Sequence, residues 1–566
     1  MCLRFVAWTL FLLISATNLR AFAQGPTPDP FAAGTRSSSQ MASTYVPLDS
    51  WVYLTLERFE ALGYLQTGFL GLRPWTRMEC TRLLIEIDEL SGGELPADLK
   101  RQYRDLTIEF APELRRLGSG STKSAELESA YYRGTWIGGT PLTDGYHFAQ
   151  TLTNDFGRPY GQGNNLYVGG ATRATASVFA FYVSGEYQST GPGITLSPGA
   201  QQAIAQADFA PSAAQGPVSS TGRFQLLDTY VAVNYKNNQL SFGKQSLWWG
   251  PEHEGPLLFS DNAPPVTMLK YDRVRPFKLP SFLGVLGPIR IQFFIGQLSG
   301  QQFVHIPTGT VGRPGLSLNP QPYINGLKLS LKPTPNFEFS VSRTAIFGGP
   351  GFPVTLHSFW RSLVSTGNSA DFNDPGDRRV AFDVTYRVPE LRDWLTFYCD
   401  AFSDDEIFPI AYPTHSAWQP GIYMPKLPGV PKLDFRAEGA VTPDRLFPGF
   451  FYFNVHYLSG YTNDRQLLGS PIGRQGSGFQ LWSTYWFSGR STIQASYRSA
   501  WVDRDFLQGG YTKDASLTAQ VPIRPDLLLS AAVQYERWRF SLISAAATTD
   551  VSTSLQLTFT PGWRRR

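Results

Sequence analysis

Apolar and polar residues alternate in many short runs between residues 131 and 559. Because successive side chains of a strand point to opposite faces, each run predicts a strand with one apolar and one polar face. Similar runs occupy residues 327–332, 433–438, 451–457, 493–501 and 554–559. The clearest run alternates four apolar residues with three charged ones: Val380, Phe382, Val384 and Tyr386 with Arg379, Asp383 and Arg387.

A soluble β-sandwich would also alternate, so the length of the strands has to decide between the two folds. The predicted strands have about ten residues, as tilted membrane-crossing strands do, whereas sandwich strands have about five or six. Short turns such as 334–336 are interspersed with long connections at 191–222, 303–324, 346–377 and 404–432. This asymmetry is typical of outer-membrane proteins. We therefore predict a mainly β fold, a closed antiparallel transmembrane β-barrel of about 18 strands, over residues 125–560.

The first 23 residues have the pattern of a secretory signal peptide. A basic start at 1–4 precedes an apolar core at 5–14 and the small-residue cleavage signal Ala21-Phe22-Ala23. No later stretch offers about twenty apolar residues without a charge, so a closed barrel is the form in which this chain could span a membrane. We expect Sec-type export and insertion into the outer membrane of a Gram-negative-type bacterium.

A helical period precedes the strands. Asp49 or Ser50 can cap a first helix, Thr76 with Glu79 forms a capping box for a second, and a third should follow Pro96. We expect five segments around the barrel: a signal peptide at 1–23, a flexible leader at 24–43, a periplasmic helical domain at 44–117, a linker at 118–124 and a C-terminal tail at 561–566.

Composition supports the barrel and gives no signal of a polyanion ligand. The chain is 14% aromatic and 17% charged, which favours a barrel over a large soluble fold. Loss of Arg4 and Arg20 with the signal peptide lowers the formal net charge from +4 to +2. Nothing in this charge indicates binding of nucleic acid.

One segment departs from the alternation. It contains Trp248-Trp249-Gly250-Pro251, a Leu-rich run at 257–260 and Asn262-Ala263-Pro264-Pro265. Trp248 and Trp249 are neighbours at the end of an incoming strand, so they should point to opposite faces, one toward lipid and the other toward the lumen.

These elements resemble the Wzi capsule assembly family, and residues 47–62 and 72–75 of the helical unit resemble it too. The resemblance implies an outer-membrane lectin without cofactor or enzymatic activity, whose lumen is closed by a periplasmic helical bundle. It implies capsular or extracellular polysaccharide, outer-membrane lipid, and the barrel-assembly and polysaccharide-export machinery as partners. The chain departs from a terminal aromatic by continuing to Arg566, so Phe559 or Trp563 would serve as the insertion signal.

Aromatic rings can stack on the C–H faces of sugars while nearby polar groups bond the hydroxyls. The candidate polysaccharide-binding residues are Trp248, Trp249, Gly250, Pro251, Glu252, His253, Tyr412, Trp418 and Tyr423. For strand tryptophans an interfacial aromatic girdle is the simpler interpretation, and Trp418, placed in the 404–432 connection, is the one expected to escape it.

Charges on the polar strand faces are a second candidate set: Arg379, Asp383, Arg387, Asp434, Arg436 and Glu438. They could bind an acidic polymer, although pairing with one another is the default expectation. The acidic run 404–406 suits a solvated loop or a calcium site better than a hydrolytic pair, and His253 lacks the spacing of a metal ligand. The alternative function is a porin or transporter, which needs the same barrel with an open lumen.

Overall fold

The computed structural model describes residues 40–119, 123–212, 218–365, 372, 376–404, 408–442 and 448–564. The expected signal peptide and most of the expected leader lie outside these residues. Among the described residues, no helix is both long and apolar enough to cross a bilayer.

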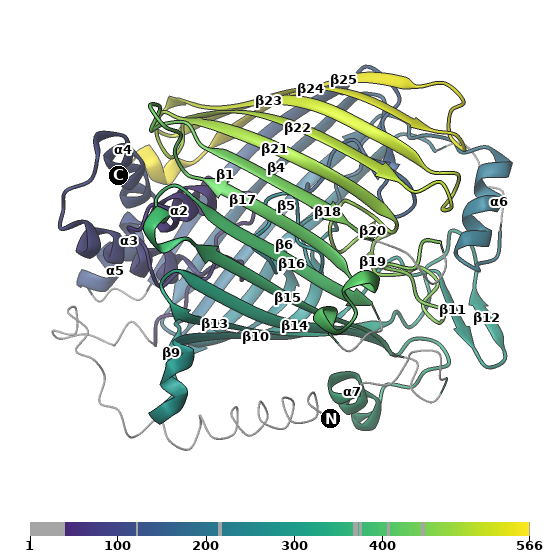
Figure 1. Cartoon of the computed structure of the whole chain (residues 1–566), viewed down its shortest axis with the longest axis horizontal. Helices are drawn as coiled ribbons and strands as arrows, with labels where there is room; N and C mark the ends of the chain where they lie inside the picture. The colour runs from purple at the N-terminus through teal and green to yellow at the C-terminus, as the bar shows by residue number, and fades with distance from the viewer. Residues whose placement is uncertain are drawn as a thin grey trace.

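Antiparallel strands form one closed wall (Figure 1). The last strand pairs with the first, from Ala130 opposite Phe559 to Ile137 opposite Ser552, which closes the barrel. The sheet has 19 strands, but β8 and β9 follow one another along the same edge of β10. The barrel therefore has 18 strands around its circumference, which confirms the predicted fold.

The wall strands are β1 (Lys123–Ile137), β4 (Gly163–Ala176), β5 (Phe179–Thr190), β6 (Thr221–Tyr235), β7 (Asn238–Gln245), β8 (Val266–Arg273), β9 (Phe277–Lys278), β10 (Pro288–Gln297), β13 (Tyr323–Thr334), β14 (Phe337–Phe347), β15 (Asp377–Arg387), β16 (Thr396–Asp404), β17 (Ala417–Met424), β18 (Phe435–Val441), β21 (Gly476–Trp486), β22 (Thr492–Val502), β23 (Gly510–Arg524), β24 (Leu527–Phe540) and β25 (Thr548–Phe559).

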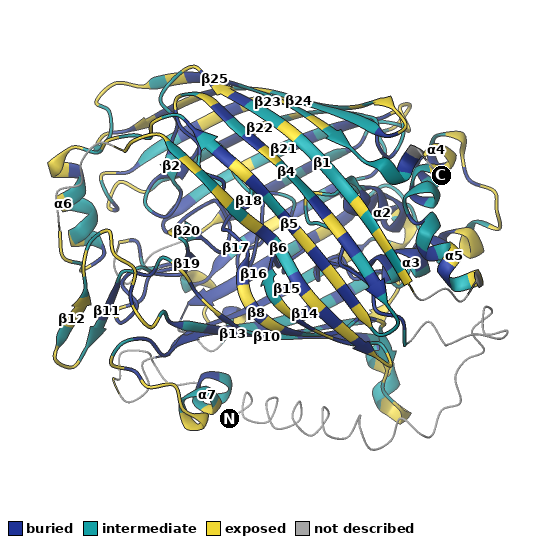
Figure 2. Ribbon diagram, turned by 180° about the vertical axis from the view of Figure 1, so that it is seen from behind, coloured by how far each residue is buried: buried dark blue, intermediate teal, exposed yellow. Residues whose placement is uncertain are grey.

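Burial alternates along these strands as the sequence predicts. In β5, Phe179, Phe181 and Val183 are exposed on the outside, whereas Ala180 and Tyr182 between them are buried. Figure 2 shows the same alternation of exposed and buried residues on neighbouring strands. The outer surface of the barrel is therefore apolar, as a lipid-facing surface must be.

The two ends of the barrel differ. Two-residue turns at 177–178, 236–237, 335–336 and 525–526 lie at the end that carries the N-terminal helices, here called the helix end. Long connections lie at the opposite, loop end. The predicted 404–432 connection is wrong, because strand β17 divides it into a loop-end connection and a helix-end turn.

The loop-end connections contain helices α6 (Pro198–Ala207) and α7 (Leu356–Val364), the 3-10 turns η4 (Pro409–Ala411) and η5 (Pro413–His415), and the hairpins β2 (Thr143–Asp144) with β3 (Ala149–Gln150), β11 (Phe303–Ile306) with β12 (Gly309–Gly312), and β19 (Thr462–Asn463) with β20 (Gln466–Leu467). Helix-end connections contain η2 (Ser281–Leu286) and η3 (Pro389–Leu391).

Four helices precede the wall: α2 (Trp51–Ala61), α3 (Arg77–Ser91), α4 (Ala97–Glu109) and α5 (Ala111–Ser119). The predicted N-caps are present, since the Ser50 side chain accepts from the Val52 amide and that of Thr76 from the Glu79 amide. The predicted capping box is only half formed, because the Glu79 carboxylate accepts from Arg82 instead of the Thr76 amide. The third helix predicted after Pro96 is present as α4, and an additional helix that was not predicted, α5, follows it. Pro112 cannot extend α4 without a clash, so the chain starts a new helix.

Three predicted boundaries also change. Helix α5 reaches Ser119 and β1 starts at Lys123, so both ends of the expected 118–124 linker belong to these elements, and its residues 120–122 lie outside the described residues. The end of the expected flexible leader is packed, because Ala42 donates its amide to the Ser177 carbonyl at 3.1 Å. The expected tail forms η6 (Pro561–Arg564), where Trp563 donates to Glu109 at 2.8 Å and lies under the Arg490 guanidinium.

The space inside the wall, the lumen, holds an apolar cluster in addition to the polar strand faces that the sequence predicts. Two loop-end connections fold inward, residues 246–265 after β7 and residues 448–475 before β21. They supply Trp249, Phe259, Tyr452 and Tyr461 to a cluster of buried residues that includes Phe294 of the wall. Residues 451–457, predicted as a strand, form no strand, because their alternating aromatic side chains pack into this cluster from an irregular segment.

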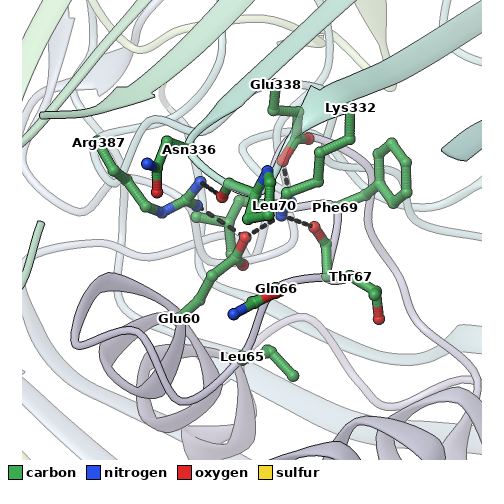
Figure 3. A network of polar contacts seen from close by, with 12 residues as sticks. Glu60, Leu65, Gln66, Thr67, Phe69, Leu70, Lys332, Asn336, Glu338 and Arg387 are labelled. Atoms are coloured by element: carbon green, nitrogen blue, oxygen red, sulfur yellow. Dashed lines mark hydrogen bonds and ion pairs between the residues drawn. The ribbon is translucent and has the colours of Figure 1, made fainter. Parts of the chain in front are cut away.

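Buried ion pairs hold the helical unit, which consists of α2 to α5 and the segments that connect them, against the lumen face of the wall. Glu60 of α2 pairs with Arg387 of β15 at 2.8 Å and with Lys332 of β13 (Figure 3). Glu338 of β14 accepts the backbone amides of Leu70 and Gly71 from the segment after α2. Charges on opposing elements thus neutralise one another where no water reaches them.

Replacement of Glu60 by Gln should loosen the helical unit. The change removes the carboxylate that pairs with both buried cations, Arg387 and Lys332, which costs about 3–5 kcal/mol. Hydrogen exchange of α2 should become much faster, while exchange in the wall strands stays slow. Glu89→Gln, at an exposed position of α3, is the matched control; equal protection of α2 in both variants would contradict the role of the pair.

Candidate functional site

The Trp248-Trp249 motif lies inside the barrel. Trp248 and Arg73 exchange two backbone hydrogen bonds of 3.0 and 3.1 Å, which join the motif to the helical unit. The Trp249 ring contacts Phe259 and Phe294, and its indole nitrogen donates to Gln292 at 2.6 Å. The prediction that one of the two rings faces lipid is wrong, because β7 ends at Gln245 and its alternation stops there.

The residues after the motif are anchored to the wall. A side chain at Gly250 would clash, since a Cβ there would lie 2.3 Å from a Glu252 carboxylate oxygen. Pro251 and Glu252 are buried. The amides of His253 and Glu254 both donate to Glu438 of β18, at 2.7 and 2.9 Å. Residues 250–254 therefore anchor the 246–265 connection to the wall strand β18.

The six predicted lumen charges are all buried, at no more than 6% exposed. Three of them hold inward elements: Arg387 binds Glu60, Arg436 binds Glu57 of α2 at 2.9 Å, and Glu438 binds the 246–265 connection.

The other three contact the wall or its connections. Arg379 pairs with Asp377 and Asp404, and Asp383 pairs with Lys328. Asp434 accepts from the Trp486 indole at 2.8 Å. Asp404, the first residue of the predicted acidic run, is thus an ion-pair partner, while Asp405 and Glu406 lie outside the described residues.

The three aromatic candidates beyond residue 404 lie in different places. Tyr412 is 45% exposed at the loop end, between η4 and η5, and its ring is parallel to that of His415. Trp418 lies on the outer face of β17 beside Phe382. This is a position of the interfacial aromatic girdle, so the prediction that Trp418 lies outside the girdle is wrong. Tyr423 is buried in the lumen, where its ring lies 4.3 Å from the Arg436 guanidinium.

An ion network at the loop end joins three connections, and sequence reasoning missed it. His147, between β2 and β3, contacts Asp144 at 2.7 Å and Asp208, the C-cap of α6, at 2.8 Å. Arg474 of the 448–475 segment pairs with the same Asp208. Burial by itself lowers the pKa of His147, but the two aspartates outweigh it and raise the pKa to about 10. The imidazole is therefore charged at neutral pH and fixes these connections to one another.

A cavity of about 500 Å³ remains in the lumen. Trp51 and Tyr53 of the helical unit and Trp248 of the motif line one side of the cavity. The wall strands β21 to β25 and β1 line the other side. Cavities of roughly 300–1,000 Å³ are of the size that binds small molecules.

Comparison with known proteins identifies the family. The capsule assembly protein Wzi family matches residues 133–552. The solved structure of Wzi from Escherichia coli, an outer-membrane protein involved in group 1 capsule assembly and a carbohydrate-binding β-barrel, is similar at a TM-score of 0.64 with 18% identity. That alignment covers 92% of this chain and 99% of the other.

Two other comparisons are more distant or shorter. An uncharacterized 55.8 kDa protein in the cps region of Klebsiella pneumoniae is 28% identical over 191 residues, or 33% of this chain. The match spans 35% of that relative's length. OpdQ from Pseudomonas aeruginosa aligns at a TM-score of 0.41 with 11% identity, over 77% of this chain and 97% of that one.

The family match covers most of the described barrel, from β1 to β25. The wall is closed, and its outer face is apolar. The protein is thus an outer-membrane β-barrel and belongs to the Wzi capsule assembly family.

Proposed function

We propose that the protein is a non-enzymatic lectin that helps attach or assemble capsular or extracellular polysaccharide at the cell surface. The Escherichia coli relative is described as a carbohydrate-binding β-barrel involved in capsule assembly, and the Klebsiella pneumoniae relative comes from a cps region. The helix end would face the periplasm, as short turns do in outer-membrane barrels, and the loop end would face outward. Outer-membrane lipid and the barrel-assembly and polysaccharide-export machinery remain expected partners.

One observation carries this proposal: the helical unit is ion-paired to the lumen wall through Glu57 and Glu60. A pore needs a continuous watery path, whereas here buried charges and an apolar cluster occupy much of the lumen. A closed barrel suits a scaffold that presents its outer connections to a polymer.

The loop end supplies a rigid platform for such a polymer. The His147 network joins three connections, which lowers the entropy that polymer binding would otherwise cost. Tyr412 offers an exposed ring on this end, where it can stack on the C–H face of a sugar. We therefore assign Tyr412 as the leading polymer contact among the candidate aromatic residues.

Deletion of the gene should release polysaccharide from the cell surface into the medium, and the wild-type gene should restore retention. Complementation with Tyr412→Ala should restore retention several-fold less well, because a stacked ring contributes about 1 kcal/mol. The matched control is Tyr235→Ala, an exposed tyrosine at the helix end. Unchanged retention in the deletion strain would refute the attachment role.

Conductance separates this proposal from the porin or transporter alternative. The purified protein in planar bilayers should show little or no stable conductance, because the helical unit occupies the lumen. Large, steady conductance steps from the wild-type protein would favour the porin. Glu57→Gln combined with Glu60→Gln should raise the frequency of openings by removing both carboxylates that hold α2.

The loop platform should depend on the charge of His147. Its folded pKa is raised to about 10, so its stabilising effect is complete below the unfolded value of about 6.5 and is lost as the pH rises through about 10. At neutral pH, His147→Gln should accelerate hydrogen exchange in α6 about ten-fold or more, since hydrogen bonds to charged groups contribute about 1.5–3 kcal/mol. The exposed His357→Gln in α7 serves as control, and equal exchange in both variants would contradict this role.

A further inference from the structure

The lumen face of the wall divides into a charged and an uncharged part. From β8 to β18 it carries buried charges, among them Lys332, Arg387 and Arg436, which bind the helical unit. On β21 to β25, together with Thr135 of β1, the lumen-facing residues are mostly Ser, Thr and Gln. We call this second region the neutral patch.

The strand register arranges the neutral patch in three cross-strand rows. The rows are Thr492, Gln520, Ser530, Gln556 and Arg133; Thr484, Gln494, Thr518, Ala532, Ser554 and Thr135; and Ser496, Ser516, Gln534 and Ser552. Arg133, at the β1 edge, is neutralised by Asp155 at 2.8 Å. A fourth row toward the loop end is charged again, with Arg498 opposite Asp514 and Asp514 opposite Glu536. The patch is therefore a bounded surface of hydroxyl and amide groups.

The cavity of about 500 Å³ lies over this patch. The helical unit is held by charges on the opposite part of the wall, so it leaves space on the uncharged side. The lining extends from Gly489, in the turn between β21 and β22, to Leu152 and Asn154 of the first loop-end connection. It therefore runs along the wall beside the helical unit and meets the inward 246–265 connection at Trp248, His253 and Asp261.

Several polar groups of the patch are unused by the protein. Thr518, Gln520 and Ser530 make no side-chain hydrogen bond to any described residue, although all three line the cavity. Hydroxyl and amide groups can both donate and accept. Trp51 of α2 lines the same cavity from the other side and adds an aromatic ring.

We propose that the neutral patch and Trp51 form a second carbohydrate site, inside the lumen, for an uncharged saccharide. Its ligand class follows from the lining: hydroxyls and amides match sugar hydroxyls, and the indole matches the C–H face of a pyranose. Arg133, the one charged residue that the rows contain, is already paired with Asp155 at 2.8 Å, and the carboxylates of Asp49 and Asp261 line the same cavity. An acidic saccharide would therefore lose its hydration without gaining an unpaired cation, which disfavours it. This site rests on the proposed lectin function and lies apart from the Tyr412 surface at the loop end.

Calorimetry on the purified full-length mature protein in detergent tests this site with neutral trisaccharides of glucose, mannose and galactose. At least one should bind, and the acidic trigalacturonate should not compete with it. Thr518→Trp places an indole in the cavity and should weaken binding ten-fold or more. Leu517→Trp places the same residue on the lipid-facing side of β23, where Leu517 is 50% exposed, and should leave binding unchanged.

A second variant covers the case in which Thr518→Trp fails to fold. Gln520→Leu keeps the side-chain size, removes the amide and should weaken binding several-fold. The site is overturned if none of the neutral trisaccharides binds, if trigalacturonate competes, or if the folded lumen variants bind as tightly as Leu517→Trp. If the lumen site is overturned but polysaccharide retention still depends on Tyr412, the proposed lectin function stands. If deletion of the gene leaves retention unchanged, the proposed lectin function itself is refuted.

Discussion

Two carboxylates of one helix, Glu57 and Glu60, determine how the interior of this barrel is organised. Their partners Arg436, Arg387 and Lys332 belong to three different wall strands, and all five side chains are buried. Burial of such charges is unfavourable unless each one is paired, so the helix and the wall stabilise one another only in this arrangement. The position of α2 in the lumen follows from it.

The position of α2 in turn orders the rest of the lumen. Arg73, which also pairs with Glu57, meets the 246–265 connection in a two-bond backbone bridge at Trp248. That connection and the 448–475 connection then pack their aromatic residues into a shared cluster. Ionic contacts thus position the helical unit, and apolar packing fills the volume between that unit and the loop end.

The features set by local sequence could be predicted, and those set by distant partners could not. Strand alternation, end asymmetry and the caps at Ser50 and Thr76 depend on neighbours in the chain, and the sequence predicted them correctly. The pairing of Glu57 with Arg436 joins residues 379 positions apart, which no spacing rule reveals. Alternation also cannot tell a lumen-facing aromatic from one in an inward connection, so the positions of Trp248 and residues 451–457 were missed.

The contacts inside the lumen give the proposed scaffold its physical basis. An empty barrel of 18 strands would enclose water and leave its loop-end connections mobile. Here the charged part of the wall binds the helical unit, the apolar cluster supports the inward connections from below, and the His147 network joins connections at the loop end. The wall thus restricts the helical unit, and the apolar cluster restricts the inward connections. The loop end therefore gains rigidity from contacts made deep in the lumen. The neutral patch takes no share in these ionic and apolar contacts, which leaves the side chains of Thr518, Gln520 and Ser530 available to a ligand.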